Sequence, residues 1–171
     1  MIRSFVDFIR SKRSPINYAR SIGVQVGENC RLISIKSGVG TFGSEPYLVS
    51  IGDHVTVAGG VQFVTHDGGV WVFREKEPDI DVFGPIKIGN NVFIGFNSIL
   101  MPGVTVADNV VIGAGSVVVS DVPPNSVVAG VPAKVIKTID EYRLSISERA
   151  DFVRSMDSAS KKEYLIGKFE G

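Results

Sequence analysis

The sequence predicts an all-β solenoid, a parallel β-helix in which short strands stack along one axis. Six consecutive hexapeptides, each opening with a large aliphatic residue, run unbroken over residues 88–123. A period of six fits neither an α-helix nor a free strand, but it suits a solenoid in which every sixth side chain points inward and stacks on the next coil. The hexapeptides are IGNNVF, IGFNSI, LMPGVT, VADNVV, IGAGSV and VVSDVP.

Two further positions of the repeat support this fold. The fifth position is small or β-branched almost throughout, so two side chains per hexapeptide can point inward and three hexapeptides can close one triangular coil. The fourth position holds residue types that tolerate positive φ or hydrogen-bond to their own backbone, which is typical of a corner. These fourth positions are Asn29, His54, Gly60, His66, Asn91, Asn97, Gly103, Asn109, Gly115 and Asp121.

The same register extends upstream, in hexapeptides that open at Ile51, Val57 and Phe63 and more weakly at Val26 and Leu32. The pattern divides the chain into three parts, a helical cap, the solenoid and a helical tail. Two insertions break the repeat and are expected to project as loops, where binding residues concentrate. The expected ranges are 1–21 for the cap, 22–137 for the solenoid, 36–50 and 67–85 for the insertions, and 138–171 for the tail.

The two ends have helical patterns. Ile2, Phe5 and Ile9 are spaced as on one helix face, among five basic residues and one acidic residue in the first 20. We favour a helix that covers the first coil, since solenoid ends need caps. The other interpretation is a basic amphipathic helix that touches an anionic membrane. In the tail, Ser145-x-x-Glu148 and Ser160-x-x-Glu163 have capping-box spacing and predict one or two helices.

Length and composition indicate one soluble domain. The 171 residues carry a formal net charge of zero, which argues against nucleic acid as the main partner. The single cysteine, Cys30, occupies an inward position, so we expect no intramolecular disulfide and a reducing, cytoplasmic location. No apolar run reaches the length of a membrane span, and no cleavable leader is evident, so we expect neither export nor insertion.

The chain resembles the hexapeptide-repeat acyltransferases, in particular the galactoside and xenobiotic acetyltransferase branch and its polysaccharide O-acetyltransferase relatives. The repeat, the stretch IGAGSVVVSDVPPNSVVAGVPAKVIK at 112–137 and THDGG at 65–69 carry the resemblance. It implies a left-handed β-helix, against the usual right-handed crossover. It also implies a homotrimer with active sites between subunits, acetyl-CoA as donor and no metal.

His66 is the expected catalytic base. An imidazole, with an ordinary pKa of about 6.5, can remove the proton of an attacking hydroxyl at neutral pH. His54 occupies the same corner position, but His66 ends the regular repeat and faces the insertion at 67–85, where the resemblance places the catalytic histidine. His54 is expected to be structural. Either Glu45 or Asp67 is expected to orient the imidazole of His66.

The other site residues follow from the insertion and from the resemblance. Trp71, Phe73 and Arg74 combine aromatic faces with a charged group, as a sugar acceptor requires, although the aromatics could equally pack on a neighbouring subunit. A backbone N–H near the insertion is expected to meet the oxyanion, and Gly84 is one of several glycines that could supply it. The donor contacts implied by the resemblance are Gly95, Phe96, Ala114, Lys134 and Lys137, with Ser120 supplying a hydroxyl where the family often has Thr-Lys-Asp.

We therefore expect an O-acetyltransferase that transfers acetyl directly from acetyl-CoA to a sugar or glycan precursor, because the inward Cys30 cannot act as nucleophile. Two alternatives stay open, an amino-sugar N-acetyltransferase and a noncatalytic scaffold. The segment 36–50 holds no asparagine, whereas the galactoside branch has one that helps to bind the acceptor. A zinc-dependent carbonic anhydrase of this fold needs three histidines, and the chain has two.

Overall fold

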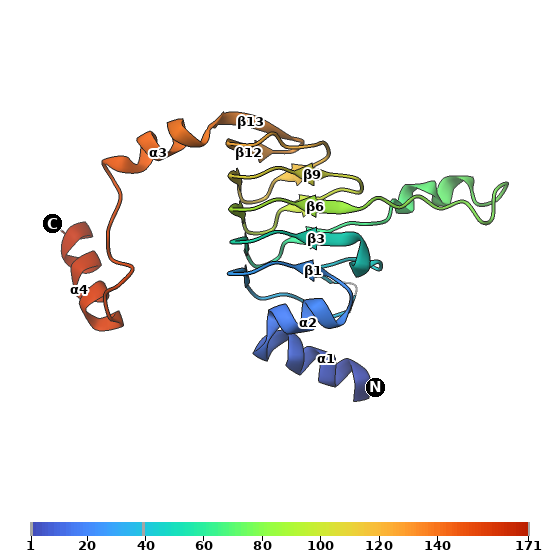
Figure 1. Ribbon diagram of the computed structural model, residues 1–171, viewed down its shortest axis with the longest axis horizontal. Coiled ribbons are helices and arrows are strands. Elements are labelled where there is room, and N and C mark those ends of the chain that lie inside the picture. Colours follow the sequence, from blue (N-terminus) through green and yellow to red (C-terminus); the bar gives the residue numbers. More distant parts are fainter. Residues whose placement is uncertain (1, 39, 171) are drawn as a thin grey trace.

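The computed structural model describes residues 2–38 and 40–170, with side chains from Val6 onward in those ranges. Short strands stack along one axis into three sheets, which we call the first, second and third sheet (Figure 1). The first sheet holds β1 (Gln25–Val26), β3 (Val49–Ile51), β6 (Ile86–Ile88) and β9 (Thr105–Val106). The second holds β13 (Ala133–Thr138), β12 (Ser126–Gly130), β10 (Val110–Ile112), β7 (Val92–Ile94), β4 (Thr56–Val57) and β2 (Arg31–Leu32). The third holds β11 (Val117–Val118), β8 (Ile99–Leu100) and β5 (Gln62–Phe63).

Strand register confirms the predicted coil of three hexapeptides. Ile88 pairs in parallel with Val106, and Ile99 pairs in parallel with Val117. The same parallel pairing joins β3 to β6 across the longer insertion, where Ser50 lies beside Lys87. The last two strands, β12 and β13, pair antiparallel and end the stack with a hairpin.

Inward positions of the repeat are buried, as predicted. Ile94, Leu100, Val106 and Ile112 have no exposed surface, and each such side chain contributes about 1.5–3 kcal/mol through removal from water. Ser98 and Ser116, at fifth positions of the repeat, are also fully buried. Both hydroxyls donate to the carbonyl of Gly113, Ser98 at 3.0 Å and Ser116 at 2.6 Å. Their polar groups are therefore satisfied inside the coil.

The predicted corner position is confirmed at eight of its ten residues, which have positive φ: Asn29, His54, Gly60, Asn91, Asn97, Gly103, Asn109 and Gly115. Asparagine side chains also join successive coils at one corner. Asn91 Nδ2 donates to Asn109 Oδ1 at 2.8 Å, and Asn109 Nδ2 donates to Asn125 Oδ1 at 3.0 Å. Neither His66 nor Asp121 is among the positive-φ residues.

Two helices, rather than the single helix that the spacing suggested, precede the first strand: α1 (Ile2–Arg13) and α2 (Pro15–Ser21). The chain leaves the helical conformation at Ser14, because a residue before proline is disfavoured in the α region. α2 lies against the first coil, where Tyr18 and Ala19 are buried. The hydroxyl of Tyr18 accepts a hydrogen bond from Gly38 N–H at 3.0 Å.

The two insertions carry short 3-10 helices, η1 (Pro46–Leu48) and η2 (Gly68–Phe73). The longer insertion projects from the stack as an arm (Figure 1). Its base is closed by an antiparallel bridge between His66 and Phe83, and by a hydrogen bond from Asp67 N–H to the carbonyl of Val82 at 2.9 Å.

The tail leaves the stack and holds α3 (Ile139–Ser147) and α4 (Ser158–Phe169) (Figure 1). Both predicted capping boxes were wrong, because Ser145 and Ser160 lie inside the helices. Thr138 caps α3 with a capping box to Glu141, and the Thr138 N–H lowers the pKa of that carboxyl. Asp157 caps α4. Across the described ranges, no helix combines the length and apolar character needed to cross a membrane.

Candidate active site

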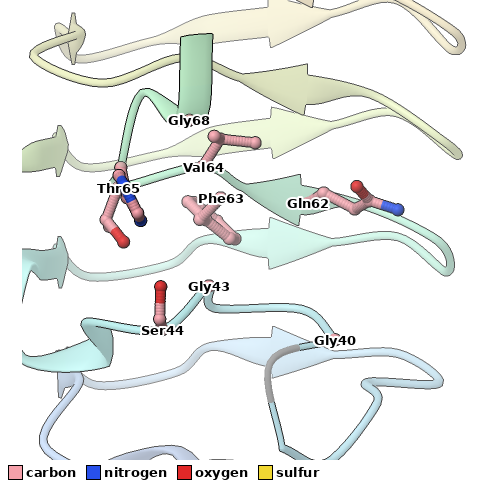
Figure 2. Close-up of a pocket in the computed structure, with 9 residues that line it drawn as sticks. Gly40, Gly43, Ser44, Gln62, Phe63, Val64, Thr65 and Gly68 are labelled. Atoms are coloured by element: carbon pink, nitrogen blue, oxygen red, sulfur yellow. The ribbon is translucent and has the colours of Figure 1, made fainter. Parts of the chain in front are cut away.

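A shallow hollow of about 260 Å³ lies between the first insertion and the coil that carries β5 (Figure 2). Figure 2 shows Gly43 and Ser44 on one side, and Gln62 and Thr65 on the facing coil. Phe63 lies beneath and stacks on Phe42, with ring centroids 5.4 Å apart. The lining residues are Gly40, Gly43, Ser44, Gln62, Phe63, Val64, Thr65, His66 and Gly68.

His66 stands at the edge of this hollow, where the longer insertion leaves the coil. Its ring lies 5.0 Å from that of Phe83, and its side chain is 29% exposed. His66 Nε2 lies 2.6 Å from Asp81 Oδ1, yet the ring N–H does not point along the contact, so this is a close polar contact and not an aligned hydrogen bond. Nε2 is shielded from water and has no aligned partner among the described residues.

The other carboxylate oxygen of Asp81 contacts Arg74. Its Oδ2 lies 3.3 Å from Nη2 of Arg74, whose Nε donates to the carbonyl of Ile80 at 3.3 Å. The guanidinium of Arg74 also lies 5.7 Å from the ring centre of Trp71. Arg74, which the sequence assigned to the acceptor, is therefore connected to His66 through Asp81, a residue that the sequence did not single out.

His54 and His66 differ in backbone conformation and in their contacts. His54 has a φ of 55°. It extends the row of corner asparagines by one coil, with its Nδ1 2.9 Å from Asn91 Oδ1. A corner residue with left-handed backbone explains its position. His66 lacks that conformation, so the corner does not account for a histidine there.

The two carboxylates proposed to orient His66 contact other groups. Asp67 accepts a hydrogen bond from Gly69 N–H at 2.9 Å and so caps η2. Glu45 Oε2 accepts from the hydroxyl of Thr65 at 2.9 Å, one residue before the histidine. The carboxylate that lies beside His66 is that of Asp81, because the returning segment of the insertion brings it opposite the imidazole.

Gly84 does not offer a free N–H for an oxyanion. Its N–H donates to the carbonyl of Thr65 at 3.0 Å, and a side chain there would meet the backbone of Gly103 at 2.3 Å. This glycine is needed for the close approach of two coils. Trp71 and Phe73, by contrast, are 71% and 55% exposed on the projecting arm.

No cluster of three or more histidine, cysteine or acidic side chains suited to a metal ion occurs in the part of the chain that the structure describes.

Comparison with known proteins agrees with this architecture. A family model described as bacterial transferase hexapeptide (six repeats) matches residues 85–120. Protein CapG of Staphylococcus aureus is 57% identical over 151 residues, which cover 88% of this chain and 87% of that protein. The chain belongs to the hexapeptide-repeat acetyltransferases. This membership implies the left-handed β-helix expected from the sequence.

Two further relatives place the enzyme among acetyltransferases. Galactoside O-acetyltransferase of Escherichia coli is 46% identical over 97 residues, which cover 57% of this chain and 47% of that protein. The solved structure of a galactoside acetyltransferase in complex with coenzyme A superposes with a TM-score of 0.55. It is 28% identical and covers 84% of this chain and 82% of that chain.

The residues expected to bind the donor do not share one corner of the enzyme. Gly95 and Ala114 stack closely where the second sheet turns into the third, since a side chain at Gly95 would meet Ala114 N at 2.5 Å. Phe96 covers Gly59 at this corner, and Lys134 pairs with Ala129 one coil further along. Ser120 follows β11 at the opposite end of the third sheet, on the corner that carries His66. Lys137 pairs with Val127, away from Lys134.

The sequence did hold one signal for Asp81. The run Asp-Val-Phe-Gly-Pro precedes β6, so these residues have to return to the coil that the chain left at His66. The periodic pattern stops at His66, however, and gives no register for the returning segment.

Proposed function

We propose that the enzyme transfers an acetyl group from acetyl-CoA to a hydroxyl of a sugar or glycan precursor, in polysaccharide biosynthesis, with His66 as general base. The observation that carries the proposal is the His66 imidazole at the edge of an open hollow, with the Asp81 carboxylate 2.6 Å from Nε2. Two relatives are named as galactoside acetyltransferases, and these names support a sugar acceptor.

The carboxylate assigns a role to each ring nitrogen. An anion beside Nε2 favours the tautomer that carries its proton there, which leaves the lone pair on Nδ1. Nδ1 then takes the proton of the acceptor hydroxyl while the hydroxyl oxygen attacks the thioester carbonyl carbon. The C–S bond breaks, and the imidazolium returns the proton to the departing thiolate of coenzyme A.

Transfer is direct, without an acetylated enzyme. The only cysteine, Cys30, is buried, and its Sγ lies 3.1 Å from the carbonyl of Gly52 inside the coil. This thiol cannot reach a thioester in the hollow. A buried free thiol also suits the reducing cytoplasm that we propose as the location.

Asp81 is a positioning residue, and Asp81→Asn is expected to lower kcat about 10- to 100-fold while KM for acetyl-CoA stays unchanged. The amide keeps the shape but loses the charge that sets the tautomer. Because Asp81 acts through His66, the double variant with His66→Ala should be no slower than His66→Ala alone. Steady-state kinetics of the single and double variants check this.

Asp79→Asn is the matched control, since Asp79 lies two residues away and is exposed. It should retain wild-type kinetics. Equal losses in Asp79→Asn and Asp81→Asn, or fully additive losses with His66→Ala, would contradict the positioning role.

We further propose a homotrimer with sites between subunits. His66 and the corner of Gly95, Phe96 and Lys134 lie at opposite ends of the third sheet within one chain. A neighbouring copy that places the second corner against the first would bring the base and the donor contacts together.

Trimers mixed from His66→Ala and Lys134→Glu chains test this arrangement, with acetyl-CoA well below its KM. An interface can then combine an intact histidine with an intact lysine, so random mixing should restore roughly a quarter of the wild-type sites. Each variant alone should stay weakly active under these conditions. Mixed chains no more active than the mean of the two pure variants would rule out sites shared between copies.

An acceptor screen tests the proposed function itself. Release of coenzyme A thiol is measured with acetyl-CoA and, in turn, nucleotide sugars, free sugars, amino sugars and serine. The proposal expects hydroxyl-bearing sugars to stimulate release above the hydrolytic background. Stimulation by amino sugars alone would favour the N-acetyltransferase, and no stimulation by any acceptor would favour a noncatalytic scaffold.

A further inference from the structure

Helix α1 presents outward the apolar side chains that the structure describes, from Val6 onward. Ser11 is 2% exposed and packs inward, where its hydroxyl donates to the carbonyl of Phe8 at 2.8 Å. Phe8 is 52% exposed, and Val6 and Ile9 are also exposed. An ordinary surface helix does the reverse, burying its apolar stripe and exposing its polar face. The exposed face of α1 is therefore unlike that of an ordinary surface helix and suits a partner outside the chain.

The capping role does not explain α1. The first coil is already covered by α2, through the buried Tyr18 and Ala19. α1 lies beyond α2, at the end of the stack opposite to β13, and packs against α2 (Figure 1). Its outer face is free of the rest of the chain among the described residues.

Cations border this face. Lys12 and Arg13 are exposed in the last turn and follow Phe8 and Ile9 by four residues each, so they share the apolar face. Lys12 Nζ lies 5.9 Å from the ring centre of Phe8, and Arg10 lies at the edge of the face. The first 21 residues hold five of the 18 basic and one of the 18 acidic residues, so the remaining 150 are net acidic.

We infer that α1 lies in the surface of an anionic membrane, with Phe8 and Ile9 in the acyl boundary and the cations at the headgroups. Lysine and arginine suit this position, because their long stems extend to the phosphates while neighbouring apolar side chains insert. At 12 residues, α1 is about 18 Å long, too short to span the roughly 30 Å core. The three exposed apolar side chains that the structure describes on α1, Val6, Phe8 and Ile9, are also far fewer than the roughly 20–30 residues that each partner contributes to a stable protein interface.

Sedimentation with vesicles tests the inference on the full chain. Vesicles of phosphatidylglycerol and phosphatidylcholine should bind the protein at low salt, and vesicles of phosphatidylcholine alone should bind it at least ten-fold less. Each basic residue near an anionic surface contributes roughly five-fold in affinity. Binding should fall at 1 M salt, where the Debye length is about 3 Å.

Two variants separate the apolar and the charged contributions. Phe8→Ser/Ile9→Ser and Lys12→Gln/Arg13→Gln should each weaken vesicle binding at least ten-fold, with thiol release on a soluble acceptor unchanged. Phe152→Ser and Lys161→Gln/Lys162→Gln are the matched controls, because these tail residues are exposed apolar and basic side chains remote from α1. Both controls should bind vesicles like the wild type.

Absence of binding to anionic vesicles at low salt, or equal losses in the tail controls, would overturn the inference. Light scattering tests the remaining alternative, association of α1 with a second copy of the chain. If Phe8→Ser/Ile9→Ser lowers the particle mass in the absence of vesicles, the face is covered by a second copy of the chain instead of a membrane.

Discussion

His66→Ala is expected to lower kcat by about 10²- to 10⁴-fold, which is the usual contribution of one general base. The loss follows from removal of the group that takes the hydroxyl proton, while the hollow and the donor corner stay in place. Thermal stability should change little, because the side chain is partly exposed and has no aligned hydrogen bond at Nε2. Thiol release with a saturating acceptor, beside thermal unfolding, checks both expectations.

His54→Ala is the matched control, since it removes the other histidine from the same repeat position. Its activity should stay within about two-fold, and the lost contact to Asn91 should cost at most about 1 kcal/mol at an exposed corner. If the two variants lost activity equally, the distinction that we draw between the histidines would be wrong.

Phe63→Ala is expected to cost about 3–5 kcal/mol of unfolding free energy, the largest effect expected on stability. Phe63 is 1% exposed, stacks on Phe42 and lines the hollow. Truncation leaves a cavity that the stacked coils cannot close, because each coil is tied to the next by parallel pairing. Urea unfolding should show a lower midpoint with an unchanged slope.

Phe152→Ala provides the comparison for this stability measurement. Phe152 is 91% exposed in the tail, so its truncation should change the unfolding free energy by less than about 0.5 kcal/mol. A loss for Phe63→Ala no larger than that for Phe152→Ala would show that the predicted inward stacking of side chains does not stabilise the coil.

The periodic part of the chain could be predicted closely because one physical constraint acts on every coil. Residues such as Ile94 and Ile112 must stack inward, and residues such as Asn91 and Asn109 must adopt positive φ at a corner. Each requirement selects a narrow set of side chains, so the sequence shows it directly.

The site was only partly predictable because it lies where the period stops. His66 could be chosen from its position at the end of the repeat, but Asp81 depends on how a 19-residue insertion at 67–85 folds back. No period constrains that path. Asp67 and Glu45, which were chosen for nearness in sequence and for charge, instead cap η2 and bind Thr65.

The ends of the chain show a different limit. The spacing of α1 predicts an amphipathic helix, but it does not reveal which face packs inward, and the structure buries Ser11 while Phe8 stays exposed. In the tail, the spacing pointed to Ser145 and Ser160 as helix caps, but the caps are Thr138 and Asp157. Each of these two residues lies directly before the first helical residue, where its side chain accepts hydrogen bonds from free N–H groups.

Mass spectrometry of the product tests the central claim most directly. The enzyme is incubated with acetyl-CoA and the best sugar acceptor. The mass of the product is measured before and after treatment with mild alkali, which cleaves acetyl esters and leaves acetamides. The account predicts one added acetyl group that alkali removes, an unmodified protein mass, and almost no product with His66→Ala. An alkali-stable product, an acetylated protein intermediate, or undiminished product from His66→Ala would contradict it.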